Sequence, residues 1–199
     1  MKNNLIFTFA LLLAAFTLNA QSYKKYSPDF VQGRVDFQVA IGLTPTFIGG
    51  TGTMTSPPIA ANLEVMVNKR LSIGAYGAHS VTETKEKIFV DGLVGAWKNT
   101  HTEAGIRLGI HFTDIPKFDF YGGPHIGIRH NKVEDMMPGM EQLNIYKGIE
   151  PVKTRGAFGG FVGARYAAKE KITAFAEIGT GASLVRVGAG FRLFKGKKS

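Results

Sequence analysis

Apolar and polar residues alternate with a period of two along much of this sequence. The clearest run spans Gly33 to Leu43, where every second residue from Val35 onward is apolar and the intervening residues are polar or small. Successive side chains of a strand point to opposite faces, so this pattern predicts a strand with one apolar face. Further runs of the same kind are Ile59–Asn68, Leu71–Val81, Thr100–Phe112, Phe118–His130, Thr154–Ala167, Ile172–Gly179 and Val185–Leu193. They make eight predicted strands of roughly ten residues, about the length that crosses a bilayer when tilted.

The connections between these runs alternate in length. Short turns are expected at Lys69–Arg70, Asp114–Lys117 and Ala168–Lys171, and long loops at Thr44–Pro58, Thr82–Asn99 and Asn131–Lys153. The last connection, Thr180–Ser183, departs from this order as a tight turn. Short turns at one end and long loops at the other are typical of barrels in outer membranes, and an even strand number places both termini at the short-turn end. Pro124 interrupts its run and predicts a bulge or a local break in the ladder.

The polar faces of the runs carry arginine but no lysine. Seven of the eight arginines fall in predicted strands, whereas none of the 16 lysines does. A water-facing surface would be expected to hold lysines, while arginine suits a confined space because its planar fork bonds two carboxylate oxygens at once. We therefore predict an all-β fold, an eight-stranded antiparallel up-and-down transmembrane β-barrel with a polar, side-chain-filled interior. The predicted interior polar network consists of Arg34, Asp36, Glu64, Glu103, Arg107, Asp119, Arg129, Arg155, Arg165, Glu177, Arg186 and Arg192.

Charges inside so narrow a barrel must pair, because they are largely removed from water. Cross-strand neighbours predict three ion pairs: Glu177 with Arg186, Glu103 with Arg129, and Arg107 with Asp119. Aromatic residues near the ends of the strands predict an interfacial girdle at the periplasmic rim, formed by Phe112, Phe118, Tyr166 and Phe191. The alternative is that these are ordinary core aromatics.

The two ends of the chain carry their own signals. Lys2, the apolar run that follows it and Ala20 predict a cleaved signal peptide over residues 1–20; a buried N-terminal helix is the alternative. An N-terminal periplasmic stub (21–32), the barrel (33–194) and a basic tail (195–199) are expected to follow. The absence of cysteine excludes disulfides and thiolate metal sites. The net charge of +9 does not predict nucleic-acid binding, because the lysines gather in turns, loops and tails.

In these features the chain resembles the small outer-membrane barrels typified by the OmpA transmembrane domain and OmpX. The resemblance rests on the strand and loop pattern, the arginine and carboxylate interior, and the closing segment Val185–Phe194, which ends in an aromatic residue. The chain departs from the pattern because Lys195 to Ser199 follow Phe194. The resemblance implies a Gram-negative outer membrane, contact with its lipid, insertion by the barrel-assembly machinery and, usually, no enzyme activity. It implies no single function.

Candidate chemistry is sparse. His79 and Ser80 are adjacent and so point to opposite faces, but His101, Glu103 and His125 are expected to cluster near the extracellular end. Two interpretations of this cluster are open. It is either a metal site or an acid–base pair, or it is simply part of the interior polar network. We predict no catalytic residue, metal or cofactor, and expect a non-enzymatic barrel that presents loops to a possible extracellular partner through residues 82–99 and 131–153. The alternatives are a narrow pore for small solutes, a lipid-modifying enzyme and a soluble ligand-binding barrel.

Overall fold

The structure, a computed structural model, describes residues 32–45, 52–88, 94–113, 115 and 117–196. The predicted signal peptide (1–20), nearly all of the predicted stub (21–32) and most of the predicted tail (195–199) lie outside the described residues.

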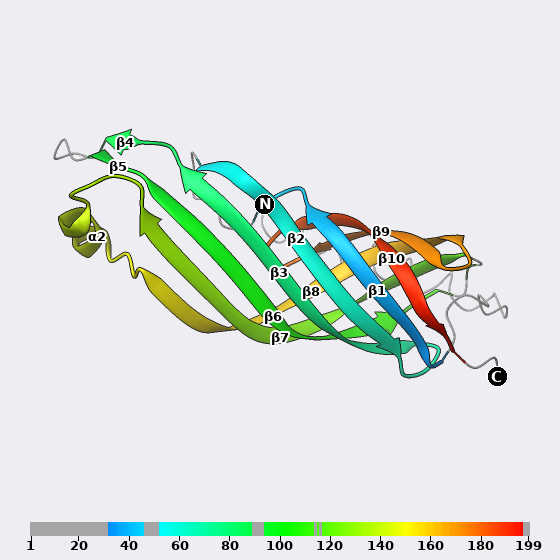
Figure 1. The fold of residues 1–199 in the computed structure, drawn as a ribbon. Coiled ribbons are helices and arrows are strands. Elements are labelled where there is room, and N and C mark those ends of the chain that lie inside the picture. Colours follow the sequence, from blue (N-terminus) through cyan, green and yellow to red (C-terminus); the bar gives the residue numbers. More distant parts are fainter. Residues whose placement is uncertain (1–31, 46–51, 89–93, 114, 116, 197–199) are drawn as a thin grey trace, which may run out of the picture.

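Eight antiparallel strands close into a barrel, as the sequence predicted (Figure 1). In chain order they are β1 (Arg34–Gly42), β2 (Gly52–Met66), β3 (Leu71–Thr84), β6 (Trp97–His111), β7 (Phe118–Asp135), β8 (Val152–Lys169), β9 (Ile172–Gly179) and β10 (Val185–Lys195). Each strand pairs with the next one in this series, and β1 pairs with β10 to close the ring. The opposed residues Arg34 and Lys195 mark where the first and last strands meet at the short-turn end.

The outer surface of the barrel is apolar and the inner surface is polar. Along β1, Phe37, Val39 and Ile41 are exposed, whereas the residues between them are buried. A soluble ligand-binding barrel would have the opposite arrangement, so that alternative is wrong for this fold. No helix in the described part of the chain is long and apolar enough to span a membrane.

The apolar outer surface forms a band of defined height. On β7 the outward-facing residues from Phe118 to Ile128 are apolar or small, and the next outward residue is His130. Eleven residues cover roughly 33 Å of strand, and a tilt of about 40° reduces this to a band about 25 Å tall. A band of this height matches the hydrocarbon-facing zone of an outer-membrane barrel.

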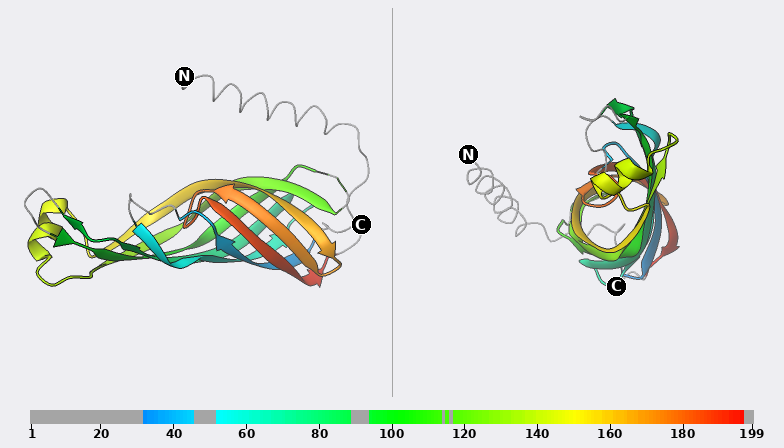
Figure 2. Two further views of the ribbon diagram at one scale, coloured as in Figure 1. Left: turned by 90° about the horizontal axis from the view of Figure 1, so that it is seen from above. Right: turned by 90° about the vertical axis from the view of Figure 1, so that its left-hand side faces the viewer.

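Five strands continue beyond the band as a curved sheet, which we call the extension. It consists of β2 from Gly52 to Pro58, β3 from His79, β6 up to Thr102, β7 from His130, and β8 up to Thr154. A two-stranded sheet of β4 (Lys87–Ile88) and β5 (Val94–Gly95) and the short helix α2 (Glu141–Lys147) lie at its tip. The end-on view of Figure 2 shows the barrel strands closed into a ring, with α2 in front of it.

The three predicted long loops are partly wrong, because strands of the extension run into them. Parts of 44–58, 82–99 and 131–153 are strand: β2 begins at Gly52, β6 begins at Trp97, β7 ends at Asp135 and β8 begins at Val152. Alternation does not reveal these parts because both of their faces are largely polar. Lysine also occurs in strands, contrary to the prediction, in the extension or at strand ends: Lys87, Lys98, Lys132, Lys153, Lys169 and Lys195.

Pro124 causes a local break and no bulge. The pairs between β6 and β7 run to Arg107↔His125 and resume at Ile110↔Gly122 without a shift in register. On the other side of β7, Pro124 stands opposite Gly160 in an uninterrupted ladder with β8. The missing N–H of proline therefore weakens only the ladder between β6 and β7.

Candidate functional site

The barrel lumen holds three linked clusters of charged side chains. The lowest, near the short turns, centres on Arg165, which is fully buried. Its guanidinium donates to Asp119 at 2.7 Å, Glu64 at 3.0 Å and Asp36 at 3.3 Å. Asp36 and Glu64 are directly opposed across β1 and β2, so the cation between them removes a repulsion that their register creates. Asp36 is also paired with Arg34 at 2.7 Å.

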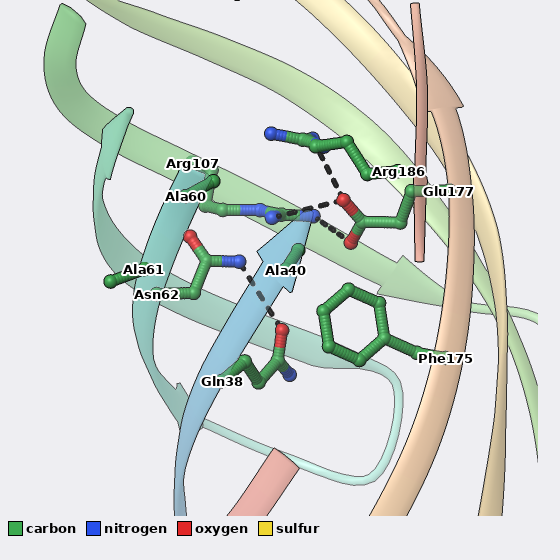
Figure 3. A pocket seen from close by; sticks show the side chains of 9 residues that line it. All are labelled: Gln38, Ala40, Ala60, Ala61, Asn62, Arg107, Phe175, Glu177 and Arg186. Carbon is green, nitrogen blue, oxygen red and sulfur yellow. Dashed lines mark hydrogen bonds and ion pairs between the residues drawn. The ribbon is translucent and has the colours of Figure 1, made fainter. Parts of the chain in front are cut away.

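The middle cluster places two guanidinium groups on one carboxylate (Figure 3). Glu177 accepts from Arg107 at 2.6 Å and from the Tyr121 hydroxyl at 2.8 Å, and it pairs with Arg186 at 2.7 Å. Because all four side chains are buried, the three hydrogen-bonding partners together replace the water that the carboxylate lost on folding.

A small cavity lies beside this cluster, between Arg107, Phe175 and the hydrogen-bonded pair Gln38 and Asn62 (Figure 3). Its volume of about 10 Å³ is the room of a single water molecule. The lumen at this height is therefore filled by side chains.

The upper cluster gathers around Glu103 at the extracellular end of the lumen. Glu103 accepts from the Tyr76 hydroxyl at 2.7 Å and pairs with Arg129 at 2.8 Å. The Nε2 atoms of His101 and His125 each lie 3.6 Å from its carboxylate, so the three residues cluster as the sequence predicted. These distances are longer than hydrogen bonds, and among the described residues no group of histidines and carboxylates is arranged to hold a metal ion.

The turn between β9 and β10 is folded inward over this cluster. Ala182 and Ser183 are buried, and a side-chain carbon on Gly181 would lie 3.5 Å from Glu103 Oε1. Ser183 Oγ donates to the carbonyl oxygen of Thr44 at 2.8 Å, which ties the turn to the end of β1. Gly181 has a φ of 124°, a conformation that favours glycine.

The predicted network residues fall into three groups. Nine are buried: Arg34, Asp36, Glu64, Glu103, Arg107, Asp119, Arg165, Glu177 and Arg186. Arg129 and Arg192 are half-buried. Arg155 is exposed, because it lies above the last pair between β8 and β9, where the barrel is no longer closed.

Of the three predicted ion pairs, two form and one does not. Arg107 does not pair with Asp119, because the register of β6 and β7 places His125 opposite Arg107. Asp119 instead lies opposite Arg165 on β8 and also contacts His111 Nδ1 at 2.8 Å. The network also has uncharged and histidine members that were not predicted, although their places in the alternation put them on the polar face: Gln38, Asn62, Tyr76, His111 and Tyr121.

The four predicted girdle aromatics all face outward and are exposed. Phe118 and Tyr166 are opposed across β7 and β8, with ring centroids 4.9 Å apart. Their role at a lipid–water interface stays a prediction.

Comparison with known proteins identifies the fold. No protein-family model matches the sequence, and no curated protein matches it. The outer membrane protein OprG from Pseudomonas aeruginosa is similar over 84% of this chain and 99% of its own, with a TM-score of 0.54 and 11% identity. Ail, the attachment invasion locus protein of Yersinia pestis, solved with the heparin analogue sucrose octasulfate, is similar over 82% of this chain and 100% of its own, with a TM-score of 0.47 and 10% identity. Outer membrane protein W of E. coli covers 82% of this chain and 99% of its own, with a TM-score of 0.46 and 13% identity. The chain therefore has the fold of the small eight-stranded outer-membrane β-barrels, with buried ion pairs inside and an apolar surface outside.

Proposed function

We propose that this protein is a non-enzymatic integral outer-membrane barrel that holds its extension outside the cell for contact with a partner. The lumen and the extension differ in a way that supports this role. The lumen is filled by ion pairs, whereas five strands continue past the apolar band to a tip that has a small core of its own. The barrel then serves as the anchor and the extension as the working part.

The tip supports this division because it is both ordered and apolar at its surface. Met140 and Leu143 are buried, and the Trp97 indole N–H donates to Asn144 Oδ1 at 2.8 Å. Ile145 is nevertheless 81% exposed and Ile88 is 75% exposed. Exposed apolar residues on an ordered element are typical of contact surfaces, and both fall within the two predicted partner segments, 82–99 and 131–153.

A narrow anion-selective pore is the second candidate function. It is favoured by the middle cluster, where Arg107 and Arg186 share the single carboxylate of Glu177. The one-water cavity beside them argues against passage of a solute without rearrangement.

The enzyme alternative has little support from the upper cluster. Ser80 stands opposite His101 in register, and His101 Nδ1 is 2.6 Å from Asn131 Oδ1, an arrangement that could orient a histidine. A serine nucleophile would need the Nε2 atom as its proton acceptor, and that atom faces Glu103 at 3.6 Å.

Two measurements test the proposal together. In planar bilayers, the wild-type protein should show no steady conductance, and a stable large channel would overturn the closed-barrel part. On intact cells that express the protein, an added protease should cut within residues 131–153 and leave a membrane-embedded fragment that covers the barrel. Resistance of this segment in intact cells, with cleavage only after lysis, would overturn its presentation outside the cell.

A further inference from the structure

The positive charge of the chain is concentrated at the short-turn end of the barrel. The segments that connect strands through the extension are residues 79–102 and 130–155, and they contain seven lysines and arginines and seven carboxylates. The three short connections and the tail are residues 68–70, 113–117, 168–171 and 195–199. They contain eight lysines and arginines and only two carboxylates, which is +6 of the formal net charge of +9. The extension is therefore neutral, and the opposite end is strongly basic.

The cations at this end surround the mouth of the barrel. Six of them lie within the described residues and are exposed, and we call them the basic rim: Lys69, Arg70, Lys117, Lys169, Lys171 and Lys195. They belong to the turns β2–β3, β6–β7 and β8–β9 and to the end of β10, at the end of the barrel opposite α2 (Figure 1). In the order of the strands around the barrel, these four places are two strands apart. A ligand that meets all of them surrounds the barrel, as bilayer lipid does, whereas a single protein partner would meet one side.

The basic rim lies at the edge of the apolar outer surface. Three of its lysines are next in sequence to an exposed apolar residue at the end of a strand. The pairs are Lys117 with Phe118, Lys171 with Ile172, and Lys195 with Phe194. One residue of a strand is about 3.3 Å long, and the headgroup region beside the hydrocarbon is roughly 5–8 Å thick. The ammonium groups of the basic rim therefore lie at the depth of lipid headgroups.

The turn between β8 and β9 brings cations of neighbouring strands together. The carbonyl oxygen of Lys117 accepts at 2.7 Å from β8, the strand that leads into this turn, and that of Lys171 accepts from Arg192 N at 2.9 Å. Glu170 is the one exposed carboxylate at this end among the described residues, and it bonds Lys195. The pKa of Glu170 lies below its usual value, first because of this hydrogen bond and further because Arg192 and Lys171 are near. One carboxylate among these cations leaves a net positive surface.

Aromatic rings border this positive surface on the membrane side. Phe118, next to Lys117, lies against Tyr166, and both rings are exposed on the outer surface. Rings at this depth pack beside the upper part of lipid acyl chains, while the long lysine side chains reach outward to the phosphates. The surface thus offers contacts to both parts of a phospholipid molecule.

We propose that the basic rim binds anionic phospholipids, with headgroups of the phosphatidylglycerol type, in preference to zwitterionic ones. Clusters of lysine and arginine at a membrane surface attract lipids of net negative charge, whereas a zwitterionic headgroup carries an ammonium group of its own. In the cell these lipids belong to the periplasmic leaflet, which the short turns face. The binding goes beyond the proposed function and does not depend on it; only the leaflet follows from the orientation that the protease experiment tests.

The test measures which lipids contact the barrel. The protein purified from membranes is placed in phosphatidylcholine bilayers with a trace of spin-labelled phosphatidylglycerol or spin-labelled phosphatidylcholine. Electron paramagnetic resonance then gives the fraction of each lipid whose motion the protein restricts. At low salt we expect phosphatidylglycerol to be preferred on the order of threefold. The preference should nearly disappear at about 1 M salt, where charges are screened beyond about 3 Å.

Two variants locate the preference on the molecule. The rim variant combines three substitutions: Lys117→Gln, Lys169→Gln and Lys171→Gln. The control variant removes the same charge from the extension and its tip: Lys85→Gln, Lys98→Gln and Lys132→Gln. The rim variant should lose most of the preference, whereas the control should keep the wild-type value. Both should retain the heat-modifiable gel mobility of a folded barrel, because none of the replaced side chains is buried. The salt titration of the wild type needs no variant.

Equal restriction of the two lipids by the wild type, or a preference that 1 M salt leaves unchanged, would overturn the inference. A preference that the rim variant keeps, or that both variants lose equally, would overturn it as well. Isolated peptidoglycan is the probe for another anionic partner at this end. If the wild type shows no lipid preference but sediments with peptidoglycan, and the rim variant does not, the rim binds the cell wall and the inference is wrong. Failure of the proposed function is recognised separately, by protease resistance of the extension on intact cells.

Discussion

Glu177 is the residue on which the charge balance of the middle lumen depends. It is the acceptor for Arg107, Arg186 and the Tyr121 hydroxyl, at 2.6–2.8 Å. Glu177→Gln keeps the size of the side chain and removes its charge. Two buried guanidinium groups would then face an amide, and its nitrogen cannot accept their hydrogen bonds.

The expected cost follows from the loss of one partner of a buried ion pair, which destabilises proteins by about 3–5 kcal/mol. Solvent screening reduces this free-energy cost only slightly, because Glu177 and Arg107 are only 2% and 3% exposed. Because the guanidinium of Arg186 loses the same partner, we expect the loss of stability to lie toward the upper end of this range. Adding Arg186→Gln to the variant should restore part of the stability, since it removes one of the two unbalanced charges.

The assay is equilibrium unfolding by urea in phospholipid vesicles, followed by the heat-modifiable mobility of the folded barrel on gels. Glu170→Gln serves as the control, because Glu170 is fully exposed in the short turn before β9 and pairs with Lys195 at the surface. The control should unfold as the wild type does. If Glu177→Gln also unfolds at the wild-type urea concentration, the lumen ion pairs do not stabilise the barrel and the reasoning fails.

Three further predictions concern the outer surface, the lower lumen and the tip. Val39→Arg, at the centre of the apolar outer face of β1, should destabilise insertion into vesicles by about 2–4 kcal/mol, and an unchanged titration would contradict the membrane band. Arg165→Lys should lower the urea midpoint, because a single ammonium cannot reproduce the forked contacts to Asp119 and Glu64; a wild-type midpoint would show that charge alone suffices there. Asn144→Ala should red-shift the emission of Trp97, the single tryptophan, without changing the gel mobility of the barrel, and an unshifted spectrum would mean that this bond does not order the tip.

The alternation of residues predicted the barrel wall well because the wall separates two very different surroundings. Each wall residue faces either the apolar outside or the polar lumen, so a period of two is imposed along every strand. Above the band the same strands have polar residues on both faces, as at Lys98 and Asn99 of β6, and the period disappears. For this reason the alternation does not predict the extension.

The ion pair predicted between Arg107 and Asp119 does not form, because neighbours within one hairpin determine only part of the network. In one antiparallel hairpin the two opposed residue numbers have a constant sum, so Glu103 opposite Arg129 requires His125 opposite Arg107. A pair between Arg107 and Asp119 would have needed a register six residues away, and the two predictions excluded each other from the start. Arg107 finds its carboxylate across the lumen, on Glu177 of β9, a strand that is not its neighbour in the sheet. Contacts of that kind depend on how the barrel closes, through the pairing of β1 with β10, and the order of residues within one hairpin does not encode them.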